Sequence, residues 1–302
     1  MHTVPTSAVF EAPEGSEAMY RYRTYLPAGP VRGLVAYLPH FGGTCDDWEV
    51  STLPTRLAAS GIASLVGLAI PEGTGYLTTP DLRALHAMLQ DAWLRIDWPS
   101  DSLVLGGFSA GGVGAVRYGE VAVAGDLAGA IRPRAIFAVD PPLDICRWYR
   151  GMQIVIRRNW PSPNLQESIY VSEVLRETFG GAPEDVPMAY ERASAVSAHL
   201  PLGGNLQHLR HTPIRLYTEP DVDFWLEHAT DLYSLNALDV VFSVNELRAM
   251  GNSRAELVVT HARGYRADLG GMRLPHAWSI VDEPDLAAWI ERQLAPERTD
   301  GD

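Results

Sequence analysis

The apolar positions of this chain alternate between two patterns. Continuous apolar runs predict buried strands, at 31–38, 62–70, 102–105, 134–139, 214–218 and 255–260. Apolar residues at a spacing of three or four predict helices between and after them, at 53–60, 81–96, 110–119 and 284–294. Buried strands that alternate with helices indicate an α/β fold, with a doubly wound, mostly parallel sheet that helices cover on both faces.

Two stretches interrupt this alternation. About seventy residues separate the strands 134–139 and 214–218, which is too long for a simple crossover. Because this stretch holds aromatic clusters and a helical piece at 168–179, we expect residues 143–210 to form an inserted cap. The core would then consist of residues 1–142 and 211–302, with an N-terminal hairpin (8–11 and 20–26) and a second helical stretch (224–250).

Composition narrows the possible partners. The 302 residues are 46% hydrophobic, and their formal net charge is −13, so neither nucleic acid nor an anionic membrane surface is an expected partner. The two cysteines, Cys45 and Cys146, form neither a disulfide framework nor a CxxC metal motif. Without a signal sequence or a long apolar segment, the expectation is a cytoplasmic protein with no metal and no cofactor.

One serine lies in a motif with a steric explanation. Residues 107–111 read Gly-Phe-Ser-Ala-Gly, after a predicted strand and before a predicted helix. A serine that protrudes from such a sharp turn needs glycines two positions before and after it, so that strand and helix pack closely. The turn also places the Ala110 N–H where it can donate to an oxyanion. The dinucleotide-binding alternative fails because the GxGxxG spacing is absent. Ser109 is therefore the predicted nucleophile.

A nucleophilic serine needs a base, and the base needs an acid. Among nine histidines, His276 lies on a loop after the last predicted strand and before the last helix, and His261 is its rival. We expect the acid in the loop after the strand 214–218, where three carboxylates occur, Glu219, Asp221 and Asp223. Asp221 is the first choice and Asp223 the alternative.

The oxyanion hole needs a second N–H group. The loop 39–44, Pro-His-Phe-Gly-Gly-Thr, follows the first buried strand and can turn sharply at its two glycines. The N–H of Phe41 is therefore expected to face Ser109 together with that of Ala110. A plain glycine turn is the alternative interpretation of this loop.

Together these motifs resemble the α/β-hydrolase superfamily, from about residue 20 to residue 294. The resemblance rests on residues 107–111, the loop 40–43, the acidic loop after 214–218 and His276-Ala-Trp278, in the chain order Ser, Asp, His. It implies a capped serine esterase that forms an acyl-enzyme on a small-molecule acyl substrate. His40, Phe108 and Trp148 are the residues expected to contact that substrate.

Other functions use the same three residue types. An acyltransferase, a thioesterase or a cyclase would need the same triad, and exclusion of water by the cap would favour transfer over hydrolysis. A non-catalytic binding protein of this fold would normally lack one triad member. The sequence names neither the physiological substrate nor the oligomeric state.

Overall fold

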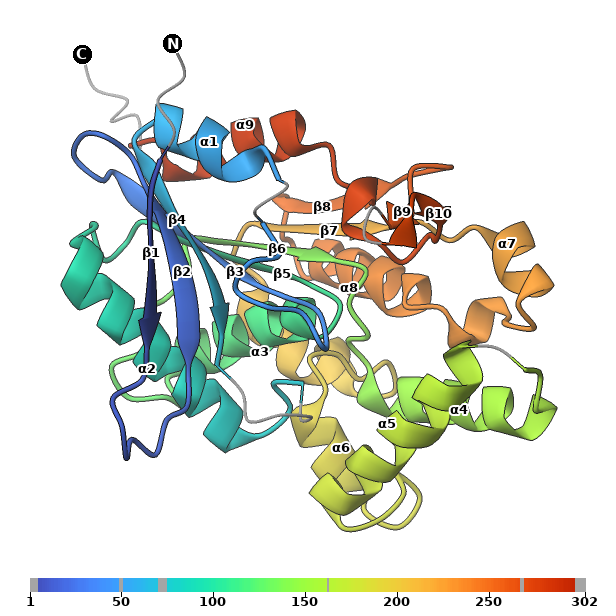
Figure 1. The fold of residues 1–302 in the computed structure, drawn as a ribbon. Helices are drawn as coiled ribbons and strands as arrows, with labels where there is room; N and C mark the ends of the chain where they lie inside the picture. The colour runs from blue at the N-terminus through green and yellow to red at the C-terminus, as the bar shows by residue number, and fades with distance from the viewer. Residues whose placement is uncertain (1–4, 49–50, 70–74, 162, 267–268, 297–302) are drawn as a thin grey trace.

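An eight-stranded sheet runs through the centre of the computed structural model, which describes residues 5–48, 51–69, 75–161, 163–266 and 269–296. The strand order is β1-β2-β4-β3-β5-β6-β7-β8 (Figure 1). The strands are β1 (Thr6–Glu11), β2 (Arg21–Leu26), β3 (Gly33–Leu38), β4 (Ile62–Leu68), β5 (Leu103–Phe108), β6 (Ala135–Val139), β7 (Ile214–Thr218) and β8 (Ala255–Val259).

Six of these strands, from β3 to β8, pair in parallel, while β1 and β2 form an antiparallel hairpin at one edge. Every residue of β3, β5, β6 and β7 is buried, as expected for parallel strands covered on both faces. The predicted strands and hairpin are confirmed, with shifts of one to three residues at their ends. The α/β class and the doubly wound, mostly parallel sheet are confirmed with them.

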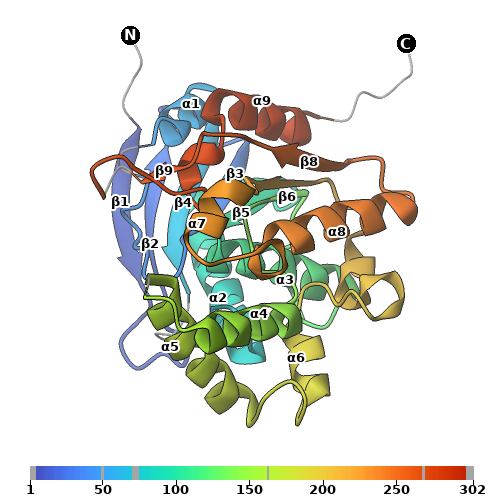
Figure 2. The ribbon, with the colours of Figure 1, turned by 90° about the vertical axis from the view of Figure 1, so that its right-hand side faces the viewer.

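Helices cover both faces of the sheet (Figures 1 and 2). On one face, α1 (Leu53–Ala59) and α9 (Glu283–Leu294) pack over a core that includes Trp48 and Trp289. On the other face lie α2 (Thr79–Ile96), α3 (Ala110–Ala124) and α8 (Ala237–Ala249). Among the described residues, no helix combines the length and the apolar character that crossing a membrane requires.

Three inserted helices form a separate layer beside the sheet (Figure 2). These are α4 (Ile145–Arg158), α5 (Pro163–Phe179) and α6 (Pro187–Ala193), and they share a small apolar core of their own. The segment that follows, η1 (Pro201–Leu209), returns to the main core through Leu206 and Leu209. The last part of the expected cap, 143–210, therefore packs with the core rather than with the inserted helices.

A buried ion pair joins the inserted layer to the core. The guanidinium of Arg147 on α4 donates to both carboxylate oxygens of Asp239 on α8, with Nε–Oδ1 and Nη2–Oδ2 distances of 2.5 and 2.7 Å. Asp239 also accepts a hydrogen bond from the N–H of Asp144, the N-cap of α4. Since both charges are buried and satisfied, this pair fixes the position of α4 above the sheet.

Short elements connect the last strands. After β7 come α7 (Val222–Glu227) and η2 (Leu232–Ser234), and after β8 come β9 (Tyr265–Arg266), β10 (Met272–Arg273) and η4 (Trp278–Ile280). Carboxyl ends of neighbouring parallel strands meet at one edge of a sheet, so these connections gather at the same edge as the turn after β5.

Candidate active site

Ser109 lies at the sharp turn between β5 and α3. Its backbone adopts φ 54° and ψ −120°, a conformation that only a strained turn imposes on a non-glycine residue. Its N–H donates to the carbonyl of Val139 at 2.9 Å, which fixes the turn against β6. A Cβ on Gly107 would lie 2.2 Å from the Gly111 backbone, and one on Gly111 would lie 2.0 Å from the Leu38 carbonyl oxygen. The strand-to-helix turn predicted from the motif is therefore present.

His276 meets Ser109 across this edge. Its Nε2 lies 3.0 Å from Ser109 Oγ, and its ring packs against Phe108 with a centroid separation of 4.8 Å. The rival, His261, follows β8 and is exposed to solvent. The structure therefore brings the serine together with the histidine that the sequence favoured.

The carboxylate beside His276 is Asp140, at the end of β6. Its Oδ2 lies 2.7 Å from His276 Nδ1. The backbone of Asp140 has a positive φ of 45°, and its N–H donates to the Tyr217 carbonyl at 2.8 Å, so the turn aims the side chain toward the histidine. Thr218 Oγ1 donates to the other carboxylate oxygen at 2.6 Å. The prediction of Asp221 as the partner of the histidine is wrong.

The acids after β7 have other contacts. Asp221 caps α7 by accepting from the Phe224 N–H at 3.1 Å, and its second oxygen lies 2.5 Å from Arg273 Nη2. The alternative, Asp223, is exposed in the first turn of α7. Neither side chain contacts His276, because both belong to a helix that begins beyond the edge of the sheet.

Glu219 is buried and holds the connection after β8. Its carboxylate accepts from Thr260 Oγ1 at 2.8 Å and from the N–H groups of Arg263 and Gly264 at 2.9 and 3.0 Å. Arg273 Nη2 lies 2.6 Å away. Burial by itself would raise the pKa of Glu219, but these donors outweigh it and lower the pKa below its ordinary value. This carboxylate therefore stays charged while it supports the segment that leads to His276.

A local signal for Asp140 exists in the sequence. Residues 139–142 read Val-Asp-Pro-Pro, so an acid directly ends a predicted buried strand. Strands β5 and β6 are neighbours, about 4.8 Å apart, whereas β7 is one strand further from Ser109. The order of the strands in the sheet, which the sequence does not state, decides between the two acids.

His40, Phe108 and Trp148 are the residues expected to contact substrate, and Phe41 and Ala110 are those expected to form the oxyanion hole. His40, Phe41 and Trp148 line the cavity at Ser109, and Ala110 lines its apolar extension. Phe108 lines neither part; it is 3% exposed and packs beneath the rings of His40 and His276. The expectation that Phe108 contacts substrate is therefore wrong, because its side chain points into the core beneath β5.

Two cavities meet at Ser109. The larger has a volume of about 420 Å³ and is lined by polar groups, including His276, Asn164 and Asn236, together with apolar side chains such as Met152 and Trp225. The smaller, of about 50 Å³, is lined mostly by apolar side chains, among them Val113, Ile145, Val171 and Leu175. Ser109 and Trp148 border both cavities, but His276 borders only the larger one. The groove is therefore asymmetric about the serine.

Within the described ranges, no group of three or more His, Cys, Asp or Glu side chains is arranged to hold a metal ion. Cys45 and Cys146 are buried and unbonded to each other.

Comparison with known proteins gives a clear result for the fold. No family model matches the sequence, and no curated protein matches it. Among solved structures, the thermophilic carboxylesterase EstE1 from a metagenomic library superimposes with a TM-score of 0.62 at 16% identity, covering 98% of this chain and 92% of that one. The esterase of Pyrobaculum calidifontis gives 0.60 at 15%, covering 97% and 86%.

A third structure has a different printed activity. The S-formylglutathione hydrolase from Agrobacterium tumefaciens superimposes with a TM-score of 0.58 at 12% identity, covering 96% of both chains. At such low identities the likeness concerns the fold alone. The chain has the α/β-hydrolase fold that the sequence motifs predicted.

Proposed function

We propose that this protein is a serine hydrolase that cleaves carboxylic esters through an acyl-serine intermediate. The observation that carries the proposal is the continuous contact from Ser109 Oγ through both ring nitrogens of His276 to Asp140, at 3.0 and 2.7 Å. This chain links a nucleophile, a base and an orienting acid in the arrangement that acyl transfer needs. The esterases among the similar folds support the same chemistry.

In the proposed reaction, Ser109 Oγ attacks the ester carbonyl carbon while its proton passes to His276 Nε2. The N–H groups of Ala110 and Phe41 would stabilise the oxyanion that forms on the carbonyl oxygen. The tetrahedral intermediate then expels the alcohol, which takes the proton from His276. A water molecule attacks the acyl carbon and gives its proton to the same nitrogen. The bond between Ser109 Oγ and the acyl carbon then breaks, Oγ takes the proton back from His276, and the carboxylic acid leaves. Asp140 holds the imidazole and stabilises its cationic form.

The asymmetry of the groove supports a proposal for where the two sides of the ester bind. The leaving oxygen must reach His276 Nε2, so the alcohol would occupy the larger cavity, which His276 lines. The acyl chain would then enter the smaller apolar cavity, whose volume of about 50 Å³ accommodates only a few heavy atoms. Short-chain acyl groups on larger, polar alcohols are therefore the proposed substrates.

A fluorophosphonate probe tests the nucleophile. We expect covalent labelling at Ser109 in the wild type and none in Ser109→Ala, with a loss of kcat of at least about 10⁴-fold. His276→Ala should also abolish labelling, whereas His261→Ala should leave it unchanged because His261 is exposed away from the serine. Folded wild-type protein that resists the probe would contradict the proposal.

A series of p-nitrophenyl esters tests the acyl side. The value of kcat/KM should be highest for acetyl to butyryl esters and fall about tenfold or more by octanoyl. Leu175→Ala, which enlarges the small cavity, should shift the optimum to longer chains, while Val155→Ala in the larger cavity should not. Adding an alcohol acceptor to the same assay separates hydrolysis from acyl transfer, since only transfer yields a new ester.

A further inference from the structure

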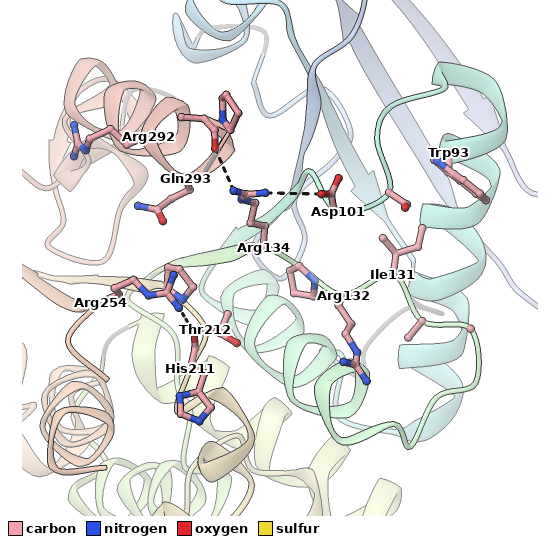
Figure 3. Close-up of a pocket in the computed structure, with 17 residues that line it drawn as sticks. Trp93, Asp101, Ile131, Arg132, Arg134, His211, Thr212, Arg254, Arg292 and Gln293 are labelled. Atoms are coloured by element: carbon pink, nitrogen blue, oxygen red, sulfur yellow. Dashed lines mark hydrogen bonds and ion pairs between the residues drawn. The ribbon is translucent and has the colours of Figure 1, made fainter. Parts of the chain in front are cut away.

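A second large cavity, drawn in Figure 3, lies at the amino ends of the strands, whereas Ser109 follows the carboxyl end of β5. Its volume is about 810 Å³, and its walls come from the segments that precede β5, β6, β7 and β8 and from the end of α9. The candidate active site lies beyond the carboxyl ends of the same strands. The two sites are thus separated by the length of the sheet, and they share none of the lining residues that the structure describes.

The side chains of this cavity are strongly basic. Arg132, Arg134, Arg254 and Arg292 line it, and Asp101 is the one carboxylate among the described lining residues. A cluster of four arginines is unexpected in a chain whose net charge is −13. In an acidic protein, such a concave cluster creates a local positive potential that concentrates anions.

Backbone carbonyls orient three of these arginines without neutralising them, and the first is Arg132, whose Nε donates to the Ala122 carbonyl at 3.2 Å. Arg134 Nη2 donates to the Ala295 carbonyl at 3.1 Å, and Arg254 Nη2 donates to the His211 carbonyl (Figure 3). Among the described residues, Arg134 has an ion pair with Asp101, whose Oδ2 lies 3.9 Å from Arg134 Nη1 and whose side chain is 78% exposed. Among the described residues, no carboxylate forms an ion pair with Arg254 or Arg292. N–H donors of the Arg134 and Arg254 guanidinium groups therefore remain available to a bound anion.

We propose that this cavity binds a small anion that carries two or more phosphate or carboxylate groups. Guanidinium groups bind both kinds of oxyanion through paired hydrogen bonds, and orientation by the backbone lowers the entropy cost of binding. Gln293 adds an amide to the same wall, and the volume is typical of small-molecule sites. A single monovalent anion would leave most of the arginines unpaired, so multivalent anions should bind more tightly.

Calorimetric titration with inorganic tripolyphosphate, and separately with citrate, tests the site on the whole Ser109→Ala protein. At an ionic strength of about 20 mM, we expect at least one probe to bind with a Kd below about 1 mM, and acetate to bind far more weakly. Binding of tripolyphosphate alone identifies phosphate as the recognised group, and binding of both probes extends it to carboxylates. Because Ser109 takes no part, failure of the proposed hydrolase activity would leave this result unchanged.

Two variants locate the binding. Arg254→Gln should weaken the tighter probe by about tenfold, and Arg292→Gln by about threefold. Arg292 forms no side-chain hydrogen bond or ion pair with another described residue, so its loss should not disturb the fold. The matched control is Arg83→Gln, an equal charge change on an exposed position of α2. No binding of either probe up to about 5 mM, or equal weakening by Arg83→Gln, would overturn the site.

Discussion

The ends of β6 and β7 lie side by side, and each is followed by a carboxylate. The two carboxylates differ in their hydrogen-bond partners. Asp140, after β6, has one oxygen on His276 and the other on Thr218. Glu219, after β7, accepts from the backbone and from side chains of the connection after β8. One acid thus faces the ring of the histidine, and the other holds the chain that carries that histidine.

The difference shows that a carboxylate near the right strand end does not suffice to orient a histidine. Glu219 also lines the cavity at Ser109, so proximity alone would have allowed either role. Its donors satisfy it completely, whereas the turn at Asp140, with its positive φ of 45°, leaves one carboxylate oxygen for His276. The backbone conformation and the satisfaction of hydrogen bonds separate the two acids.

The largest expected difference in kcat/KM is between a variant of Asp140 and a variant of Asp221, the acid that the sequence favoured. Asp140→Asn should lower kcat/KM by about 10³–10⁴-fold, because an amide can neither hold the same tautomer of His276 nor stabilise its cation. Asp221→Asn should change it by less than about threefold, since Asp221 contacts Arg273 and the start of α7. Steady-state ester hydrolysis measures both. A collapse in Asp221→Asn with activity retained in Asp140→Asn would reverse the assignment.

Replacing Glu219 should lower the stability of the protein. Glu219→Gln replaces a buried charged acceptor by an amide whose NH₂ group faces donors, so we expect the free energy of unfolding at neutral pH to fall by about 2–4 kcal/mol. Denaturation in urea measures it, with the exposed Glu227→Gln on α7 as the matched control. Equal stabilities of Glu219→Gln and Glu227→Gln would contradict the role of this carboxylate.

The difference in the free energy of unfolding between wild type and Glu219→Gln should depend on pH, because the pKa of Glu219 is lowered in the folded protein. A carboxylate with a lower pKa in the folded state stabilises the protein fully above its ordinary pKa, which is about 4.3. That contribution is lost as the pH falls through the folded-state value. The gap between wild type and Glu219→Gln should therefore be widest near neutral pH and close in acid. A gap that widens in acid would contradict the sign.

Most of the fold could be predicted from the sequence because buried parallel strands and amphipathic helices leave local patterns. Ser109 was predictable because its motif is local in sequence, although a Cβ on Gly111 would also meet the Leu38 carbonyl of a distant strand. His276 was predictable from its place on a loop between the last predicted strand and the last helix. The end of the cap was harder to predict from the sequence, because the segment Pro201–Leu209 packs against helices that are far away in sequence. Helical content alone does not say which core a segment joins.

The acid depends on an arrangement that no local pattern contains. Whether Asp140 or Asp221 reaches His276 depends on strand order, on the turn at residue 140 and on the contact between Asp221 and Arg273. The basic cavity could not be predicted from the sequence for the same reason. Its arginines come from three separate segments, at residues 132–134, 254 and 292, and only the folded chain brings these segments together.

The smallest change in activity is expected for Thr218, which links the end of β7 to the end of β6. Thr218 is the last residue of β7, yet its hydroxyl donates to Asp140 at 2.6 Å, so the β7 end positions the acid of the β6 end. Thr218→Val removes this donor with little change in volume, and we expect kcat to fall about tenfold with KM unchanged. Thr218→Ser keeps the hydroxyl and should restore kcat, while Thr212→Val, just before the same strand, should leave it unaltered. If Thr218→Val instead raised KM alone, or if serine failed to rescue it, the side chain would act through packing, and Asp140 would depend on its own turn for its position.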